Sequence, residues 1–154
     1  MTPPDDEPAI ILADPPALED QEAIRAALRA FNQQQLDRLG TPGPVHTGPL
    51  AFLLRRPGTG ETVGGLWASV SFDWMSIDFL FVPDEWRGRG LGARLLAVAE
   101  AEAKKRGCAG LWLNTFGFQA PTFYQKAGFE VFGTLDDNPR GSQRLFLRKR
   151  IDGA

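Results

Sequence analysis

Several residue types are scarce in this chain of 154 residues, and each scarcity excludes a class of protein. The single cysteine, Cys108, can form neither an internal disulfide nor a zinc site, which suits a reducing compartment. Apolar runs stay well short of the roughly 18 residues that a membrane-spanning helix needs. The formal net charge of −2 gives no overall attraction for nucleic acid. The sequence therefore predicts a cytoplasmic protein with no metal, no nucleic-acid partner and no membrane partner.

The composition is that of one folded domain. Hydrophobic residues make up 43% of the chain and include eleven phenylalanines and four tryptophans, enough to build a core. We therefore expect a single domain over residues 1–154. Residues 1–8 are rich in proline and acidic residues, unlike a secretory signal, and we expect them to be flexible.

Hydrophobic spacing predicts a mixed α/β protein. The expected helices cover residues 17–32 (with a further turn at 36–39), 90–106 and 121–126, and the expected strands cover 9–12, 50–56, 61–71, 74–82, 109–115, 131–135 and 143–150. This order favours an open mixed sheet with helices on both faces. The proline-rich loop 40–49 is our candidate for a substrate-facing wall, and we expect its residue His46, the only histidine, to be solvated.

A glycine-spaced turn after the strand 74–82 is the most informative stretch. Gly88, Gly90 and Gly92 occupy alternate positions around the start of a predicted helix. Arg87 precedes the first of these glycines, and Arg89 lies between Gly88 and Gly90. Glycines let a turn aim several backbone N–H groups at one point, and the positive end of the helix faces the same point. The turn therefore predicts a site for an anion, most plausibly a diphosphate.

Two other phosphate loops fit this stretch less well. A dinucleotide fold needs G-x-G-x-x-G early in a parallel unit, and a Walker loop needs a Lys-Ser or Lys-Thr pair, which the chain lacks. The pattern R-x-x-G-x-G/A, formed by Arg87, Gly90 and Gly92, instead resembles the acyl-coenzyme A loop of the GNAT superfamily of N-acetyltransferases. A plain strand-to-helix turn is the structural alternative.

A second motif strengthens the resemblance. Phe123, Tyr124, Gly128 and Phe129 are similar to the F-Y-x-x-x-G-F signature of that superfamily, and both motifs occur in the expected order. The resemblance spans about residues 9–150 and implies a mostly antiparallel GNAT sheet. It also implies an acetyl-CoA-dependent transfer of an acetyl group to a primary amine, on a small molecule or a protein, within a ternary complex. Homodimers are common in the superfamily, so a homodimer is an expectation.

The resemblance also implies a set of cofactor-binding residues. The strand before the loop is expected to bulge and part from its neighbour, so that backbone groups of residues 80–82 bind the pantetheine arm and polarise the thioester carbonyl. Many members have a cofactor-contacting asparagine at the position of Gly117, and either Asn114 or Gln119 could replace it here. The full set is Leu80, Phe81, Val82, Arg87, Gly88, Arg89, Gly90, Leu91, Gly92, Ala93, Asn114, Gln119 and Phe123.

Two side chains are candidates for proton transfer. Tyr124, the only tyrosine, could protonate the leaving thiolate, since a phenol and a thiol have neighbouring reference pKa values of about 10 and 8.5. The alternative is an aromatic side chain that only packs on the sheet. Asp78, at a place where histone-acetylating members carry a glutamate base, could deprotonate the amine or merely orient it.

Other readings remain open for the chain as a whole. A non-catalytic acyl-CoA sensor would need only the glycine turn, so the presence of both Asp78 and Tyr124 argues against it. A dinucleotide-dependent oxidoreductase is disfavoured by the loop spacing. The basic residues Arg144, Arg148, Lys149 and Arg150 predict a solvated edge strand at the C-terminus.

Overall fold

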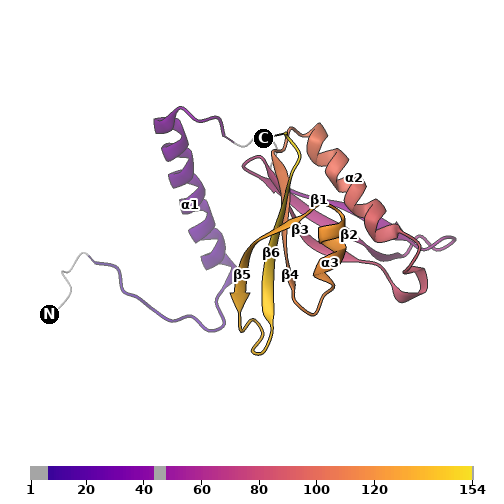
Figure 1. Cartoon of the computed structure of the whole chain (residues 1–154). Helices are drawn as coiled ribbons and strands as arrows, with labels where there is room; N and C mark the ends of the chain where they lie inside the picture. The colour runs from indigo at the N-terminus through magenta and orange to yellow at the C-terminus, as the bar shows by residue number, and fades with distance from the viewer. Residues whose placement is uncertain (1–6, 44–47, 154) are drawn as a thin grey trace. The chain divides into compact units, whose positions relative to one another are not determined.

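The structure is a computed structural model that describes residues 7–43 and 48–153 (Figure 1). The chain divides into two compact units, Met1–Gly43 and Pro44–Ala154. The single domain expected over residues 1–154 therefore stays a prediction. Of the segment expected to be flexible, only residues 7 and 8 are described, and they belong to no helix or strand. His46 lies outside the described residues, so its expected solvation stays a prediction as well.

The first unit contains one helix, α1, over Leu18–Leu39. The sequence predicted a helix and a separate turn, but the structure joins them. Gln33 Nε2 donates to Asp37 Oδ1 (2.8 Å), a contact one helical turn apart that spans the expected break. The helix ends at Gly40, whose φ of 63° is the left-handed conformation that commonly follows a last helical turn.

The strand predicted over residues 9–12 is wrong. These residues belong to no strand, and the side chains of residues 10–12 are between 80% and 102% exposed. A short apolar run fits a strand only when a neighbouring strand accepts its hydrogen bonds and covers its side chains. Local hydrophobicity alone was therefore an insufficient signal here.

The second unit is an open sheet of six strands in the order β1-β2-β3-β4-β6-β5 (Figure 1). Only β3 and β4 pair in parallel, so the predicted mixed α/β fold with a mostly antiparallel sheet is confirmed. Helices on both faces stay a prediction. The elements are β1 Gly48–Arg55, β2 Thr62–Ser71, β3 Trp74–Phe81, a 3-10 turn Asp84–Trp86, α2 Leu91–Lys105, β4 Gly110–Phe116, α3 Pro121–Lys126, β5 Glu130–Asp136 and β6 Gln143–Arg150.

The core lies between the sheet and α2. Alternate residues of the central strands are buried under the helix, such as Leu66 in β2, Met75 in β3 and Leu111 in β4. Helix α2 contributes a stripe of buried side chains at helical spacing: Leu95, Leu96, Ala99 and Ala103. Val98, on the same helix, is 44% exposed and lies outside this stripe.

Two irregularities of β3 open the sheet at one end. In the register with β2, Trp67 lies opposite Phe79 and Ala68 lies opposite Ile77, so Asp78 is the extra residue of a β-bulge. Pairing with β4 runs from Trp74 only as far as Ile77, which lies opposite Leu113. Beyond this point β3 and β4 separate, as the resemblance implied. Among the described residues, no helix has the length and hydrophobicity required to cross a bilayer.

Candidate active site

A cavity of about 920 Å³ lies where β3 and β4 separate. Its walls come from the end of β3, the glycine turn, the start of α2, the end of β4 and the start of α3. Fourteen of the fifteen site residues singled out from the sequence line it, and Arg89 does not. They are Asp78, Leu80, Phe81, Val82, Arg87, Gly88, Gly90, Leu91, Gly92, Ala93, Asn114, Gln119, Phe123 and Tyr124.

Sequence reasoning missed five further lining residues: Phe79, Trp86, Thr115, Phe118 and Ala120. Phe79 and Trp86 sit next to predicted site residues, so their neighbours in the chain were a usable signal. Ala120 likewise follows the predicted site residue Gln119. It adopts a left-handed conformation (φ 34°, ψ 60°), uncommon for alanine, at the residue before α3.

The glycine turn presents backbone donors to the cavity. Gly88 and Gly90 have φ values of 74° and 77°, which a residue with a Cβ adopts only with strain. The first hydrogen bond within α2 runs from the N–H of Arg94 to the carbonyl of Gly90 (3.0 Å). The N–H groups of the preceding first turn therefore have no partner inside the helix and are, with the helix dipole, available to an anion.

Gly92 has a different role from its neighbours. A Cβ atom there would lie 3.0 Å from Phe123 Cζ. The absence of a side chain at Gly92 therefore lets the aromatic ring from α3 approach the first turn of α2. Close approach, rather than an unusual backbone conformation, explains the glycine at this position.

Arg87 stabilises the turn through contacts with the residues that precede it in the chain. Its Nε donates to the carbonyl oxygen of Val82 (2.8 Å), its guanidinium pairs with Asp84, and it lies 5.6 Å from the centroid of the Phe81 ring. These contacts connect the end of β3 to the turn that follows. A direct contact of Arg87 with a phosphate stays a prediction.

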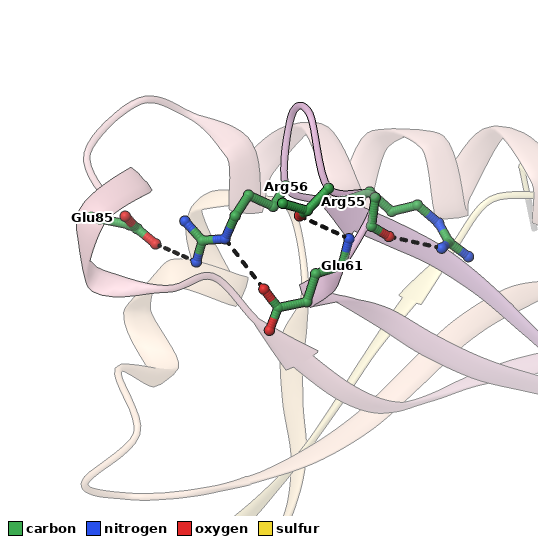
Figure 2. Close-up of polar contacts among 6 residues, drawn as sticks. Arg55, Arg56, Glu61 and Glu85 are labelled. Carbon is green, nitrogen blue, oxygen red and sulfur yellow. Dashed lines mark hydrogen bonds and ion pairs between the residues drawn. The ribbon is translucent and has the colours of Figure 1, made fainter.

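A second arginine, Arg56 directly after β1, supports the same turn from outside (Figure 2). Its guanidinium donates to Glu85 Oε1 (3.1 Å) and Glu61 Oε2 (3.4 Å) and stacks on Trp86 at 5.1 Å from the ring centroid. Trp86 lines the cavity, so Arg56 connects the β1–β2 hairpin to the cavity wall. The adjacent Arg55 donates only to the carbonyl of Gly60, within the hairpin (3.1 Å).

Asp78 lies at the cavity as the bulge residue of β3. Ser69 Oγ donates to its Oδ2 (2.8 Å) and Ser76 Oγ donates to its Oδ1 (3.0 Å). A carboxylate offers about four acceptor positions, so these two bonds fix its orientation and leave capacity for a further donor. The bulge and the two hydroxyls therefore present an oriented carboxylate to the cavity.

Tyr124 lies on α3, half-buried between two other aromatic rings. Phe123 and Phe129 meet it edge to face, with ring centroids at 5.1 Å and 6.1 Å. Burial raises the pKa of the Tyr124 phenol above its ordinary value, since the charged phenolate is poorly solvated there. The phenol is therefore fully protonated at neutral pH and can donate a proton.

Of the two candidates for the missing asparagine, Gln119 is already engaged in the loop after β4. Its Oε1 accepts from the Phe116 N–H (3.1 Å) and from Thr115 Oγ1 (3.3 Å). Asn114 is exposed and lines the cavity. No group of three or more His, Cys, Asp or Glu side chains that could hold a metal occurs in residues 7–43 and 48–153.

Fold and site together define a class of protein. A mixed sheet that separates beside a glycine turn, with a tyrosine on the helix α3 that lines the same cavity, fits the arrangement that the resemblance to N-acetyltransferases implied. The sequence model of the "Acetyltransferase (GNAT) family" matches residues 15–129. The chain belongs to this family of enzymes, whose acyl donor is acetyl-CoA.

Individual relatives agree. An acetyltransferase of Agrobacterium fabrum is 34% identical over 141 residues, which cover 92% of this chain and 98% of the relative. Blasticidin-S acetyltransferase of Streptomyces morookaense is 42% identical over 93 residues, which cover 60% of this chain and 68% of the relative. The crystal structure of an acetyltransferase from Bacillus cereus superposes on this chain with a TM-score of 0.78 at 29% identity. The superposition covers 93% of this chain and 98% of the Bacillus cereus chain.

The substitution Gly90→Ala tests the anion site. A Cβ at this left-handed position costs about 1–2 kcal/mol, so we expect the Kd for coenzyme A to rise roughly tenfold in calorimetric titration. Gly141→Ala is the control, because Gly141 has a similar φ (79°) and equally open space but lies in the β5–β6 connection. It should lower the melting temperature without changing the Kd. An unchanged Kd for coenzyme A in Gly90→Ala would contradict an anion-binding role of the glycine turn.

The substitution Arg56→Met tests whether the contacts of Arg56 with Glu85 and Trp86 stabilise the glycine turn. It removes the ion pairs and the stacking on Trp86 while keeping most of the side-chain length, so we expect the Kd for coenzyme A to rise roughly two- to tenfold. Arg55→Met should leave that Kd unchanged, because Arg55 contacts only the hairpin. Equal effects of the two variants would show that Arg56 acts through hairpin stability alone.

Proposed function

We propose that the protein transfers an acetyl group directly from acetyl-CoA to a primary amine on a small cationic molecule, within a ternary complex. One observation supports this most: a single cavity brings together the anion-binding turn, the phenol of Tyr124 and the carboxylate of Asp78. A cytoplasmic location and a homodimer belong to the same proposal.

The residues present fit coenzyme A. Its diphosphate would bind the N–H groups of the glycine turn and the first turn of α2. Its pantetheine arm would pair with backbone groups of residues 80–82, which follow the last β3–β4 pair at Ile77 and Leu113. When bound, acetyl-CoA supplies a thioester whose carbonyl carbon an amine can attack.

Tyr124 is the proposed general acid. The leaving thiolate must take up a proton, and thiols have a reference pKa of about 8.5, below that of a phenol. Burial raises the pKa of Tyr124 further, which keeps the phenol protonated but makes it a weaker acid. Proton transfer therefore depends on a short contact between the phenol and the sulfur rather than on acid strength.

Asp78 is the proposed acceptor of the amine proton. An acceptor amine arrives mainly as an ammonium ion, and the oriented carboxylate of Asp78 attracts it and can take its proton directly or through one water. Cys108 has no part in this scheme. It is 4% exposed, and burial raises the pKa of its thiol, so an acetyl-cysteine intermediate is disfavoured.

The acceptor end of the cavity indicates a substrate class. Besides Asp78 it carries two strongly exposed aromatic rings, Phe79 at 70% and Phe118 at 66% exposed. Exposed rings beside a carboxylate suit an amine that is joined to a flat or apolar body. Blasticidin S is the first molecule to test, because a relative is named for acetylating it.

The decisive experiment measures thiol release from acetyl-CoA against a panel of amines that includes blasticidin S, polyamines and N-terminal peptides. We expect release with a cationic small molecule and a product one acetyl group heavier by mass spectrometry. Tight coenzyme A binding with no release for any acceptor would instead indicate a sensor of acyl supply. Turnover of peptides alone would refute the small-molecule acceptor.

Replacing Tyr124 by phenylalanine should lower kcat by roughly 10²–10⁴ and leave coenzyme A binding unchanged. In the unaltered enzyme, the raised pKa of Tyr124 places the loss of the acid form above about pH 10. Its kcat should therefore show no fall from tyrosine ionisation between neutral pH and that point. Full kcat in the Tyr124→Phe variant would refute the proposed general-acid role of Tyr124.

The variant Asp78→Asn distinguishes proton acceptance from orientation. Asparagine keeps the shape, and its one amide oxygen can still accept from a serine hydroxyl while its NH2 group donates to the other, but it cannot take a proton. We expect the acidic limb of the kcat/KM profile to change along with a large fall in kcat. If the acidic limb is unchanged and only the KM for the amine rises, Asp78 orients the substrate.

A further inference from the structure

Lys149 in β6 joins the two helices that carry the site. Its Nζ donates to Glu100 Oε2 in α2 (2.6 Å) and to the carbonyl oxygen of Ala127 at the end of α3 (2.9 Å). The sequence predicted a solvated edge strand for this basic segment. In the structure β6 lies between β4 and β5, and the side chain of Lys149 is only 25% exposed.

The carbonyl that Lys149 binds is one of the end groups that a helix leaves without an internal partner. Helix α3 has six residues and no fully buried side chain, and its Phe123 and Tyr124 pack against the core while only partly buried. Toward its start, Phe123 touches the first turn of α2 at Gly92. Lys149 supplies the corresponding attachment at its other end.

The packing between the helices is incomplete at that end. A second cavity of about 230 Å³ lies between α2 and the segment after α3, lined by Leu96, Ala97, Ala127 and Phe129 among others, with Glu100 and Lys149. Empty space gives no dispersion attraction, so apolar contact between the two helices is reduced there. The polar bridge through Lys149 spans the gap instead.

Glu100, the acidic partner of the bridge, is ionised at neutral pH. The hydrogen bond from Lys149 lowers the pKa of Glu100, and Lys104 pairs with the same carboxylate (3.1 Å). Lys149 and Glu100 are both about three-quarters buried, so their attraction is screened less than that of an exposed pair. Lys104 is 56% exposed and lies within α2 itself.

We propose that Lys149 is a positioning residue that holds α3, and with it the phenol of Tyr124, at a fixed distance from α2. The proposal rests on the general-acid role of Tyr124 proposed above. Lys149 does not line the 920 Å³ cavity, so we expect it to act through α3.

Kinetics of Lys149→Met and Lys104→Met make the first test, in the full chain with the amine found above. A small displacement of a catalytic group can cost about a hundredfold in rate, so we expect kcat of Lys149→Met to fall by roughly 10–100-fold. The Kd for coenzyme A should stay within about twofold, because the glycine turn is untouched. Lys104→Met removes a partner of the same carboxylate and should match the unaltered enzyme in both.

A second readout does not depend on activity. Tyr124 is the only tyrosine, so the ultraviolet absorbance of tyrosinate follows this one phenol. When α3 loosens in Lys149→Met, water reaches the ring, and its raised pKa should fall toward the ordinary value of about 10. Lys104→Met should titrate like the unaltered protein.

The outcomes separate the two proposals. Full kcat in Tyr124→Phe would refute the general-acid role of Tyr124. The ultraviolet titration of the Tyr124 phenol in Lys149→Met would still report on the position of α3. Equal titration and equal kcat in Lys149→Met and Lys104→Met would overturn the positioning role. If Lys149→Met fails to fold by circular dichroism, Glu100→Gln weakens the same bridge. It should then lower both kcat and the pKa of Tyr124, and no change in either would overturn the role.

Discussion

The site depends on the point where β3 and β4 stop pairing, at Ile77 and Leu113. Backbone N–H and C=O groups beyond this point lack the neighbour that a continuous sheet would supply, and such groups are costly to bury unpaired. Water or a ligand with alternating donors and acceptors must satisfy them. An extended amide-containing arm such as pantetheine meets that requirement, and the glycine turn one step further on offers donors for its diphosphate.

The bulge at Asp78 belongs to the same constraint. One extra residue against β2 changes the direction of the strand and carries the carboxylate into the cavity, where Ser69 and Ser76 orient it. The separated strand end then needs support of its own. Arg87 supplies it from within the turn, and Arg56 supplies it from the β1–β2 hairpin (Figure 2).

The site was predictable from sequence where its function lies in local backbone geometry. The alternating glycines of the turn indicated an anion site, and the resemblance to the F-Y-x-x-x-G-F signature selected the aromatic pair on α3; residues of both motifs line the cavity. Contacts between distant residues left no such trace. Arg56 meets Glu85 across 29 positions and Lys149 meets Glu100 across 49, and nothing in the local pattern selects these pairs. The strand predicted at residues 9–12 failed for the related reason that a strand needs a partner.

The environment of Tyr124 imposes the last condition on the chemistry. Burial between Phe123 and Phe129 keeps the phenol protonated and limits competition from water, but the same burial makes it a weaker acid. A weak acid transfers its proton efficiently only when it is already within hydrogen-bond distance of the acceptor. The short helix that carries it has no fully buried side chain of its own. Its position depends on the packing of Phe123 and Tyr124 against the core and, in our proposal, on its attachments at Gly92 on one side and at Lys149 on the other.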